Sequence, residues 1–205
     1  MRPPPPNPWG DRRRVRVGLL GGSFNPAHGG HRHIAELALK LLRLDEVWLL
    51  VSPQNPLKPA TGMAPLAERM ASAHAVTAGN RRLRVSALET RLGTRYTADT
   101  LTLLHTRFGR TRFVWLMGDD NLIQLEHWAR WERIFAVVPV AILARGPYSA
   151  RALAAKAARR FDHYRSGAEG ARCLCTKPPP AWVFLHIRRH PASSTAIRSL
   201  NRQKT

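Results

Sequence analysis

The stretch VRVGLLGGSFNPAHGGH, residues 15–31, contains the features that decide the fold. Its first part, from Val15 to Leu20, is mostly apolar and ends at two glycines, which is typical of a buried strand that stops at a tight turn. Polar residues and two histidines follow, and apolar residues then recur at helical spacing between residues 34 and 42. The stretch therefore predicts a strand, a glycine-rich turn and the start of a helix.

Short apolar runs alternate with amphipathic stretches along the rest of the chain. The predicted strands cover residues 15–20, 46–51, 83–87, 112–117, 137–143 and 182–187. The predicted helices cover residues 34–42, 64–78, 96–105, 119–135 in two pieces, 150–160 and 195–202, with Thr94 or Thr97 as the cap of the third. Such alternation is typical of an α/β fold with a doubly wound, mostly parallel sheet, a Rossmann-like arrangement. Ligands of such sheets bind beyond the carboxyl ends of the strands, where the polar clusters described below fall.

The chain carries a formal net charge of +20, from 33 Lys and Arg against 13 Asp and Glu among 205 residues. Such a charge favours polyanions, which include nucleic acids, anionic lipids and phosphorylated small molecules. The basic residues are spread over nearly every segment, so solvated surface arginines explain the charge equally well. A basic nucleic-acid-binding module therefore stays as a rival of another class, although we do not expect nucleic acid to be the main partner.

Composition also bears on domains and compartment. The apolar fraction of 44% predicts one globular domain over residues 14–205, whereas the Pro-rich and then basic residues 1–13 predict a disordered tail. No apolar run is long enough to cross a bilayer and no signal peptide is recognisable, so we expect no membrane partner. Cys173 and Cys175 lack further zinc ligands and are poorly placed for a disulfide, which predicts two thiols in a cytoplasmic protein. The sequence leaves open whether the chain forms a homo-oligomer.

A pair of histidines follows the first predicted strand. His28 and His31 flank two glycines and, three residues apart, share one face of the first helical turn. Backbone N–H groups and the helix dipole favour an anion there, and two imidazoles add donors for a phosphate. Two other interpretations stay open: solvent-facing turn histidines, or part of a metal site with Glu36. The segment is not the G-x-G-x-x-G fingerprint, so hydride transfer with a dinucleotide is not indicated.

A second candidate phosphate-binding segment, SSTAIR, lies near the other end of the chain at residues 193–198. Hydroxyls followed by an arginine at a helix start can bind phosphate. The alternative is an ordinary hydroxyl cap with Arg198 as a solvated charge. Because the first and last helices of a doubly wound sheet can converge at one crevice, the two segments together predict a clamp for a polyphosphate.

These segments resemble the signatures of one enzyme superfamily. GGSFNPAHGGH is similar to the H-x-G-H motif of nucleotidyltransferases, and SSTAIR is similar to their late I-S-S-T-x-I-R motif. Residues 89–101 (ETRLGTRYTADTL), residues 117–121 (MGDDN) with Trp128, and the turn at residues 145–148 resemble the bacterial nicotinate-nucleotide adenylyltransferases. The resemblance covers about residues 15–200.

The resemblance implies transfer of the adenylyl group of ATP to nicotinate mononucleotide, which gives deamido-NAD and pyrophosphate without a covalent intermediate. It implies catalytic roles for His28, His31 and Arg198. For binding of the ATP phosphates it implies Gly21, Gly22, Ser23, Phe24, Lys58, Ser193, Ser194 and Thr195. Mg²⁺ is expected to come with ATP, held by phosphate oxygens and water rather than by protein ligands. The nearest rivals are superfamily members that act on phosphopantetheine, nicotinamide mononucleotide or a cytidylyl acceptor.

For the acceptor, the resemblance implies binding of nicotinate mononucleotide by Asn25, Thr94, Tyr96, Thr97, Asp120, Trp128 and Arg145. It implies that Trp128 stacks on the pyridine ring and that backbone N–H groups near Tyr96 and Thr97 face its carboxylate. Ordinary core packing is the alternative for Trp128, and Trp131 could share its helix face. Four features depart from the family pattern. Asn25 stands where many members have Asp, and Leu57 stands where His is frequent. Ala192 stands where the late motif usually begins with Ile, and Gly146 and Pro147 are inverted relative to the usual R-P-G.

Overall fold

The computed structural model describes residues 5–53, 62–144, 146, 149–188, 190–192, 194 and 197–199. Its centre is a seven-stranded sheet in the order β3-β2-β1-β4-β5-β7-β6, in which every neighbouring pair is parallel. The strands are β1 (Arg16–Gly22), β2 (Glu46–Val51), β3 (Leu83–Ser86), β4 (Arg112–Gly118), β5 (Val140–Ala144), β6 (Arg165–Ser166) and β7 (Trp182–His186). The predicted doubly wound parallel sheet is confirmed. Its strand order reverses between β1 and β4, the point at which such sheets bind ligands.

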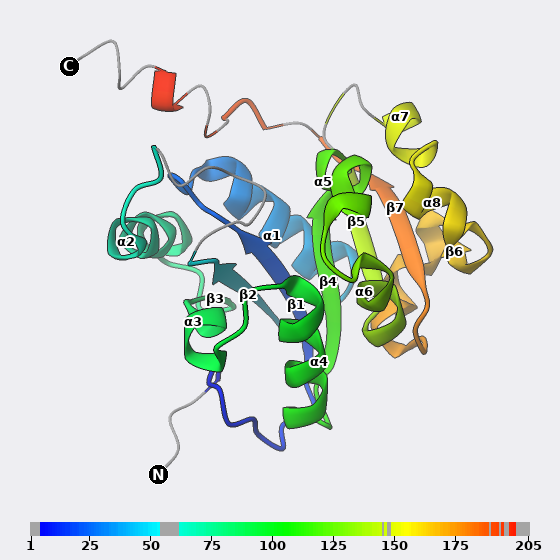
Figure 1. The fold of residues 1–205 in the computed structure, drawn as a ribbon, viewed down its shortest axis with the longest axis horizontal. Coiled ribbons are helices and arrows are strands. Elements are labelled where there is room, and N and C mark those ends of the chain that lie inside the picture. The colour runs from blue at the N-terminus through cyan, green and yellow to red at the C-terminus, as the bar shows by residue number, and fades with distance from the viewer. Residues whose placement is uncertain are drawn as a thin grey trace.

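Helical segments cover both faces of the sheet (Figure 1). One face packs against α1 (Gly29–Leu41), α2 (Leu66–Thr77) and the 3-10 segment η3 (Ala168–Thr176). The other packs against α3 (Leu88–Leu92), α4 (Thr97–Arg107), α5 (Asp119–Gln124), η1 (Leu125–His127), α6 (Trp131–Val137), α7 (Ser149–Leu153) and α8 (Lys156–Arg160), with η2 (Asp162–Tyr164) following α8. Side chains of successive strand residues alternate between these two buried clusters, as a parallel sheet covered on both faces requires.

The observed elements differ from the predicted ones where few residues in the sequence mark the end of a helix or strand. The strand predicted at 137–143 begins only at Val140, because α6 continues through Val137 and Pro139 has no N–H for the ladder. The helix predicted at 150–160 is two short helices, α7 and α8, separated at Ala155, whose backbone is extended with ψ 153°. The elements α3, β6, η2 and η3 were not predicted. Of the helix predicted at 195–202, the structure describes residues 197–199, which are helical.

Residues 5–13 do not form the predicted disordered tail. Asn7 is 1% exposed, and its side-chain oxygen accepts the N–H groups two and three positions on, each at 2.9 Å. Gly10, with φ 87°, lies against the backbone of Arg107, whose guanidinium donates to the Pro8 carbonyl. An asparagine-closed turn therefore anchors this segment on the end of α4. Its proline content disfavours helix and central strand but leaves packing free.

A buried guanidinium ties together the loops that follow β1 and β2. Arg69 of α2 is 2% exposed, and burial lowers its pKa. It donates to the carbonyl oxygens of Ser23 (2.8 Å), Ser52 (2.7 Å), Pro53 (2.8 Å) and Ala64 (2.9 Å). These bonds satisfy carbonyl groups that no helix or strand would satisfy, so one side chain fixes both loops at the carboxyl edge of the sheet.

A buried carboxyl supports the loop between α3 and α4. Glu89 is 6% exposed, and burial raises its pKa to about 7, an effect that a hydrogen bond from Thr100 opposes. The Thr100 hydroxyl lies 3.5 Å from Glu89 Oε1 and 2.8 Å from the Thr94 hydroxyl. The predicted cap of α4 at Thr94 or Thr97 is wrong, because the N-cap is Tyr96 and it makes no side-chain capping bond.

We predict that Arg69→Met lowers the free energy of unfolding by about 3 kcal/mol or more, because it strands several buried carbonyl oxygens. Urea denaturation measures the change. Arg81→Met, at an exposed arginine nearby in the chain, is the control and should change stability by less than about 0.5 kcal/mol. An equally small effect of Arg69→Met would contradict the role assigned to this guanidinium.

We predict a pH-dependent difference in stability between the wild type and Glu89→Gln. The raised pKa means that the folded protein holds the Glu89 proton more tightly than the unfolded chain, whose carboxyl has a pKa near 4.5. This contribution to stability is fully present below the unfolded pKa and is lost as pH rises through about 7. The unfolding free energy of the wild type, relative to the variant, should therefore fall by up to about 3 kcal/mol between acid and neutral pH. Urea unfolding across that pH range tests this, with Glu68→Gln at an exposed site as the control; a difference independent of pH would refute it.

Candidate active site

The segment between β1 and α1 is a short, tightly packed connection. Phe24 adopts a left-handed backbone conformation, φ 48°, which is rare for a bulky residue, and its side chain is 2% exposed. Its ring lies 4.9 Å, centroid to centroid, from the imidazole of His31. Phe24 was predicted to help bind phosphate. The structure places it beneath the histidine, where it positions the imidazole from below.

The two histidines of the motif cap their own helix. His28 is the N-cap of α1, and its Nδ1 accepts the Gly30 N–H at 3.1 Å. The Nδ1 of His31 accepts the His28 N–H, also at 3.1 Å, which completes a reciprocal capping box. The centroids of the two rings lie 3.9 Å apart, and their planes are tilted by 42°. Since each Nδ1 is an acceptor, each neutral imidazole must carry its proton on Nε2, and both rings are therefore N–H donors at that atom.

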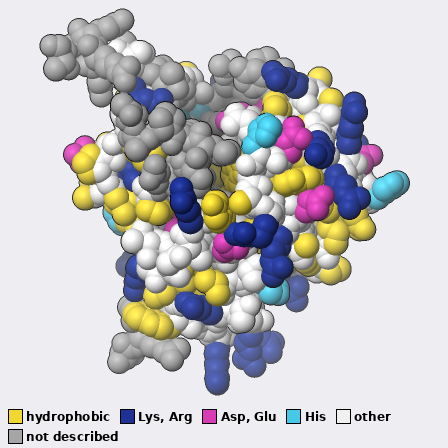
Figure 2. Space-filling view, viewed as in Figure 1, with side chains coloured by type: hydrophobic (Ala, Val, Ile, Leu, Met, Phe, Trp, Pro, Cys, Tyr) yellow, Lys and Arg dark blue, Asp and Glu magenta, His cyan; other side chains and the backbone are white. Residues whose placement is uncertain are grey.

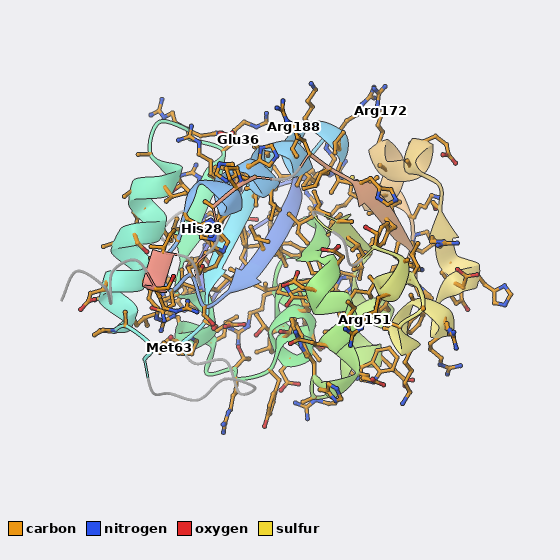
Figure 3. The ribbon with its side chains drawn as sticks, turned by 90° about the horizontal axis from the view of Figure 1, so that it is seen from above. His28, Glu36, Met63, Arg151, Arg172 and Arg188 are labelled. Carbon is orange, nitrogen blue, oxygen red and sulfur yellow. The ribbon has the colours of Figure 1, made fainter. Side chains whose placement is uncertain are left out.

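Several observations of the structure bear on the two other interpretations of the histidine pair. His28 is only 6% exposed, so it is not a solvent-facing turn residue. Glu36, the carboxylate considered for a metal site, instead accepts from Arg32 at 2.8 Å and from Asn80 at 3.3 Å. Figure 3, in which His28 and Glu36 are labelled, shows them apart. Across the described residues, no three His, Cys, Asp or Glu side chains are grouped so that they could hold a metal ion.

The last segment of the chain docks on the loop that precedes α1. The Ser194 hydroxyl donates to the Pro26 carbonyl at 3.1 Å, and the Arg198 guanidinium donates to the Asn25 carbonyl at 2.6 Å. In Figure 1 the described parts of this segment, coloured orange to red, lie at the top of the molecule. Two motifs more than 160 residues apart in the sequence are thus in direct contact, as the predicted convergence requires. Ser193 and Thr195, like Lys58 and Arg145, lie outside the described residues.

The glycines of the motif have a packing requirement. A Cβ on Gly21 would lie 2.4 Å from the indole of Trp115, and a Cβ on Gly22 would lie 3.2 Å from the ring of Phe24. Both glycines were predicted to let the backbone approach a phosphate. The structure shows that room for the ring of Trp115 already demands a residue without a side chain at Gly21. Ser23, the next residue, has a buried hydroxyl with no hydrogen-bond partner among the described residues.

Most of the residues expected to bind an acceptor, among them Tyr96 and Trp128, lie beyond β3 and β4, and an arginine connects the segments after these two strands, whereas Asn25 follows β1. Arg130 sits with its guanidinium 5.1 Å above the ring of Tyr96 and donates to Asp99 at 2.5 Å. Tyr96 and Asp99 belong to the start of α4, and Arg130 directly precedes α6. No side chain caps α4, so the first amides of this helix, beginning with Thr97, receive no side-chain capping bond from the N-cap residue.

The two tryptophans that the sequence did not separate have different surroundings. Trp131 begins α6 and packs edge-on against Phe161, with ring centroids 6.0 Å apart. Trp128 is the C-cap of η1, outside any helix, and is partly buried against the same hydrophobic cluster. They therefore do not share a helix face. Asp120 lies in the first turn of α5, directly after β4, beside the more deeply buried Asp119.

Three side chains that position these elements were not predicted from the sequence: Arg69, Glu89 and Arg130. Nothing distinguishes two of them among the 33 Lys and Arg of the chain. A signal for Glu89 was available, since a lone acid among apolar residues at the start of a motif can be buried. On the face seen in Figure 2, basic side chains lie scattered among hydrophobic and acidic ones, without one continuous basic patch.

The chain is similar to proteins of one known family. The family model described as cytidylyltransferase-like matches residues 19–200. A Gluconobacter oxydans protein named probable nicotinate-nucleotide adenylyltransferase is 50% identical over 184 residues, covering 90% of this chain and 94% of its own. A Bradyrhizobium protein of the same name is 50% identical over 185 residues, covering 90% and 96%.

Solved structures show the same fold. Nicotinic acid mononucleotide adenylyltransferase of Plasmodium falciparum, complexed with NaAD, superposes with a TM-score of 0.68 at 15% identity, covering 93% of this chain and 89% of that one. The described residues contain no helix that is long and apolar enough to cross a membrane. With half of its residues identical to its relatives over nearly its whole length, the chain belongs to the cytidylyltransferase-like family and, within it, to the bacterial nicotinate-nucleotide adenylyltransferases.

Proposed function

We propose that the protein transfers the adenylyl group of ATP to nicotinate mononucleotide, releasing pyrophosphate and forming deamido-NAD. One observation carries the proposal: the reciprocal histidine cap of α1 and the docked C-terminal segment meet at the switch point of a parallel sheet. The names of the relatives supply the substrates. The site supplies the reason, because it presents N–H donors to an anion from two directions.

The 5′-phosphate of the acceptor would attack the α-phosphorus of ATP, and pyrophosphate would leave from the opposite side. The attacking group is already an anion at neutral pH, so the reaction needs no general base and no covalent intermediate. Catalysis then consists of holding two substrates in line and stabilising charge on the phosphates. Alignment of this kind can contribute on the order of 7–11 kcal/mol to lowering the barrier.

His28 and His31 would donate from Nε2 to oxygens of the α- and β-phosphates. Both rings are fixed by their Nδ1 bonds to the backbone, so their donors are oriented before substrate arrives. Arg198 and Ser194 hold the facing segment in place through the Asn25 and Pro26 carbonyls, and the charge of Arg198 would act on the outer phosphates.

Mg²⁺ belongs to the same proposal as a companion of ATP. Because both imidazoles have their lone pair on Nδ1 engaged and a proton on Nε2, they suit phosphate oxygens rather than a metal ion. The residues described at this site therefore fit an ion held by phosphate oxygens and water, the usual state of Mg²⁺ with nucleotides. Its charge would neutralise the leaving pyrophosphate.

At the acceptor end, the uncapped start of α4 would receive the nicotinate carboxylate, and the partly buried Trp128 would stack on the pyridine ring. Arg130 and Tyr96 connect these two elements, so they would keep the distance between them constant. The cytoplasm is the compartment we propose. Cys173 and Cys175 are both free thiols, which suits a reducing environment.

We predict that His31→Ala lowers kcat by about 10²–10³, the usual loss for one preorganised donor at a site of developing charge. Steady-state pyrophosphate release measures it. His74→Ala, an exposed histidine on α2, is the matched control and should leave kcat unchanged. Thermal unfolding of both variants separates loss of the cap from loss of the donor. Near-wild-type turnover by folded His31→Ala would sink the assignment.

We also predict that the enzyme prefers nicotinate mononucleotide to nicotinamide mononucleotide, because only the acid offers a carboxylate to the open amides of α4. Product formation from each acceptor, at equal concentration and saturating ATP, tests the preference. Equal rates, or a preference for the amide, would assign the protein a dual or amide-specific acceptor instead. A pantetheine phosphate acceptor in the same assay separates this function from the nearest superfamily rival.

A further inference from the structure

A histidine outside both family motifs lies at the start of α1. His190 follows β7 and precedes the docked segment that contains Ser194 and Arg198. A Cβ on Gly29 would lie 3.0 Å from both Cε1 and Nε2 of this imidazole. In a helix the Cα–Cβ direction tilts toward the N-terminus, so the ring edge that carries Nε2 borders the N-terminal end of α1.

The tautomer of His190 is fixed in the same way as that of the two motif histidines. Its Nδ1 accepts the Ala192 N–H at 3.1 Å. A neutral ring with Nδ1 as acceptor carries its proton on Nε2, the atom that lies beside Gly29. The local turn therefore places an N–H donor beside the first residue of a 13-residue helix, whose N1 amide has no acceptor in its own helix.

Several contacts hold His190 in this position. The carbonyl oxygen of Ala192 approaches the position of a Gly30 Cβ to 3.2 Å, so the segment lies directly over the first turn of α1. His33 of α1 contacts the same segment, with its Nε2 2.9 Å from the Arg188 carbonyl and its ring 5.7 Å from that of His190. The glycines at positions 29 and 30 leave the room in which this segment sits.

We infer that His190 is a third imidazole donor of the phosphate-binding site, one that binds the polyphosphate of ATP from the C-terminal side. The inference rests on the proposed function for the identity of the ligand. His28 and His31 donate from within α1, whereas His190 donates from a segment that also carries Ser194 and Arg198. The phosphates would thus be bound by two imidazoles at the start of α1 and by one imidazole from the segment that follows β7.

Two substitutions separate the donor from the turn. His190→Asn keeps an oxygen that can accept the Ala192 N–H, as asparagine commonly does two residues ahead, but has no donor where Nε2 lies. His190→Gln is long enough to place an amide N–H near the Nε2 position. His163→Asn, at an exposed histidine in η2, is the matched control.

Calorimetric binding of a non-hydrolysable ATP analogue is the primary measurement, with KM and kcat from pyrophosphate release beside it. We expect His190→Asn to weaken binding of the analogue and to raise the KM for ATP by about 10-fold or more, the usual effect of losing a hydrogen bond to a charged group. The kcat and the KM for the acceptor should change by less than about 3-fold, and His190→Gln should recover most of the affinity.

Wild-type affinity in His190→Asn would overturn the inference. So would equal loss in both variants, since that pattern marks a packing role that any change to the ring disrupts. The binding measurement also separates this inference from the proposed function. Suppose that the wild type binds the ATP analogue but that none of the mononucleotide acceptors tested leads to release of pyrophosphate from ATP. The proposed reaction is then wrong, and the affinities of the variants for the analogue still decide the role of His190.

Discussion

The bonds between two imidazole Nδ1 atoms and the backbone at the start of α1 are the constraint on which the site depends. His28 and His31 each accept an N–H group of the motif itself, so the same contacts that start the helix also choose the tautomer of both rings. Serine or aspartate would cap the helix as well, but neither would leave a donor pointing outward. Phe24 beneath His31 and the glycines between the histidines serve this arrangement, because each gives the rings their place.

The parallel sheet turns this local cap into a site with two sides. Because β1 and β4 are neighbours and run in the same direction, the loops that follow them emerge at one edge. Side-chain hydrogen bonds join these loops to one another and fix their positions at this edge. Arg69 binds the carbonyl oxygens of the loops after β1 and β2, and Arg198 binds the loop before α1 from the end of the chain. Here guanidinium groups fix backbone carbonyls, which explains part of the basic character of the chain without any polyanion.

The sequence predicted the sheet and singled out the two segments that meet at its edge, because apolar periodicity and glycine punctuation act locally. It did not predict the capping box, since the pairing of His28 with His31 through Nδ1 depends on φ and ψ at the helix start. Arg69 and Arg130 escaped for another reason: their roles arise from partners that the fold brings close, and nothing in their neighbourhoods marks them. Glu89 differs, because an acid among apolar residues carries a signal of burial that was overlooked. The N-terminal segment shows the reverse error. Its prolines correctly exclude regular structure, yet Asn7 and Gly10 build a turn that packs against α4.

The N-termini of α1 and α4 at this edge are built differently. The difference matches the two groups that they would bind in the proposed reaction, a phosphate at α1 and the acceptor's carboxylate at α4. The first turn of α1 is capped by its own histidines, so an anion there meets imidazole N–H groups, which can follow a phosphate whose charge grows during reaction. The first turn of α4 has no side-chain cap, so an anion there meets backbone amides and the helix dipole, which suit a carboxylate whose charge does not change. Glu89 lies beside the start of α4, where its carboxyl is near the Thr100 hydroxyl, and burial raises its pKa to about 7. A carboxyl with this pKa is only partly ionised at neutral pH, so it would repel a bound carboxylate less than a fully ionised one. In the proposed reaction, burial of Glu89 would therefore link the packing of α3 to the choice of acceptor.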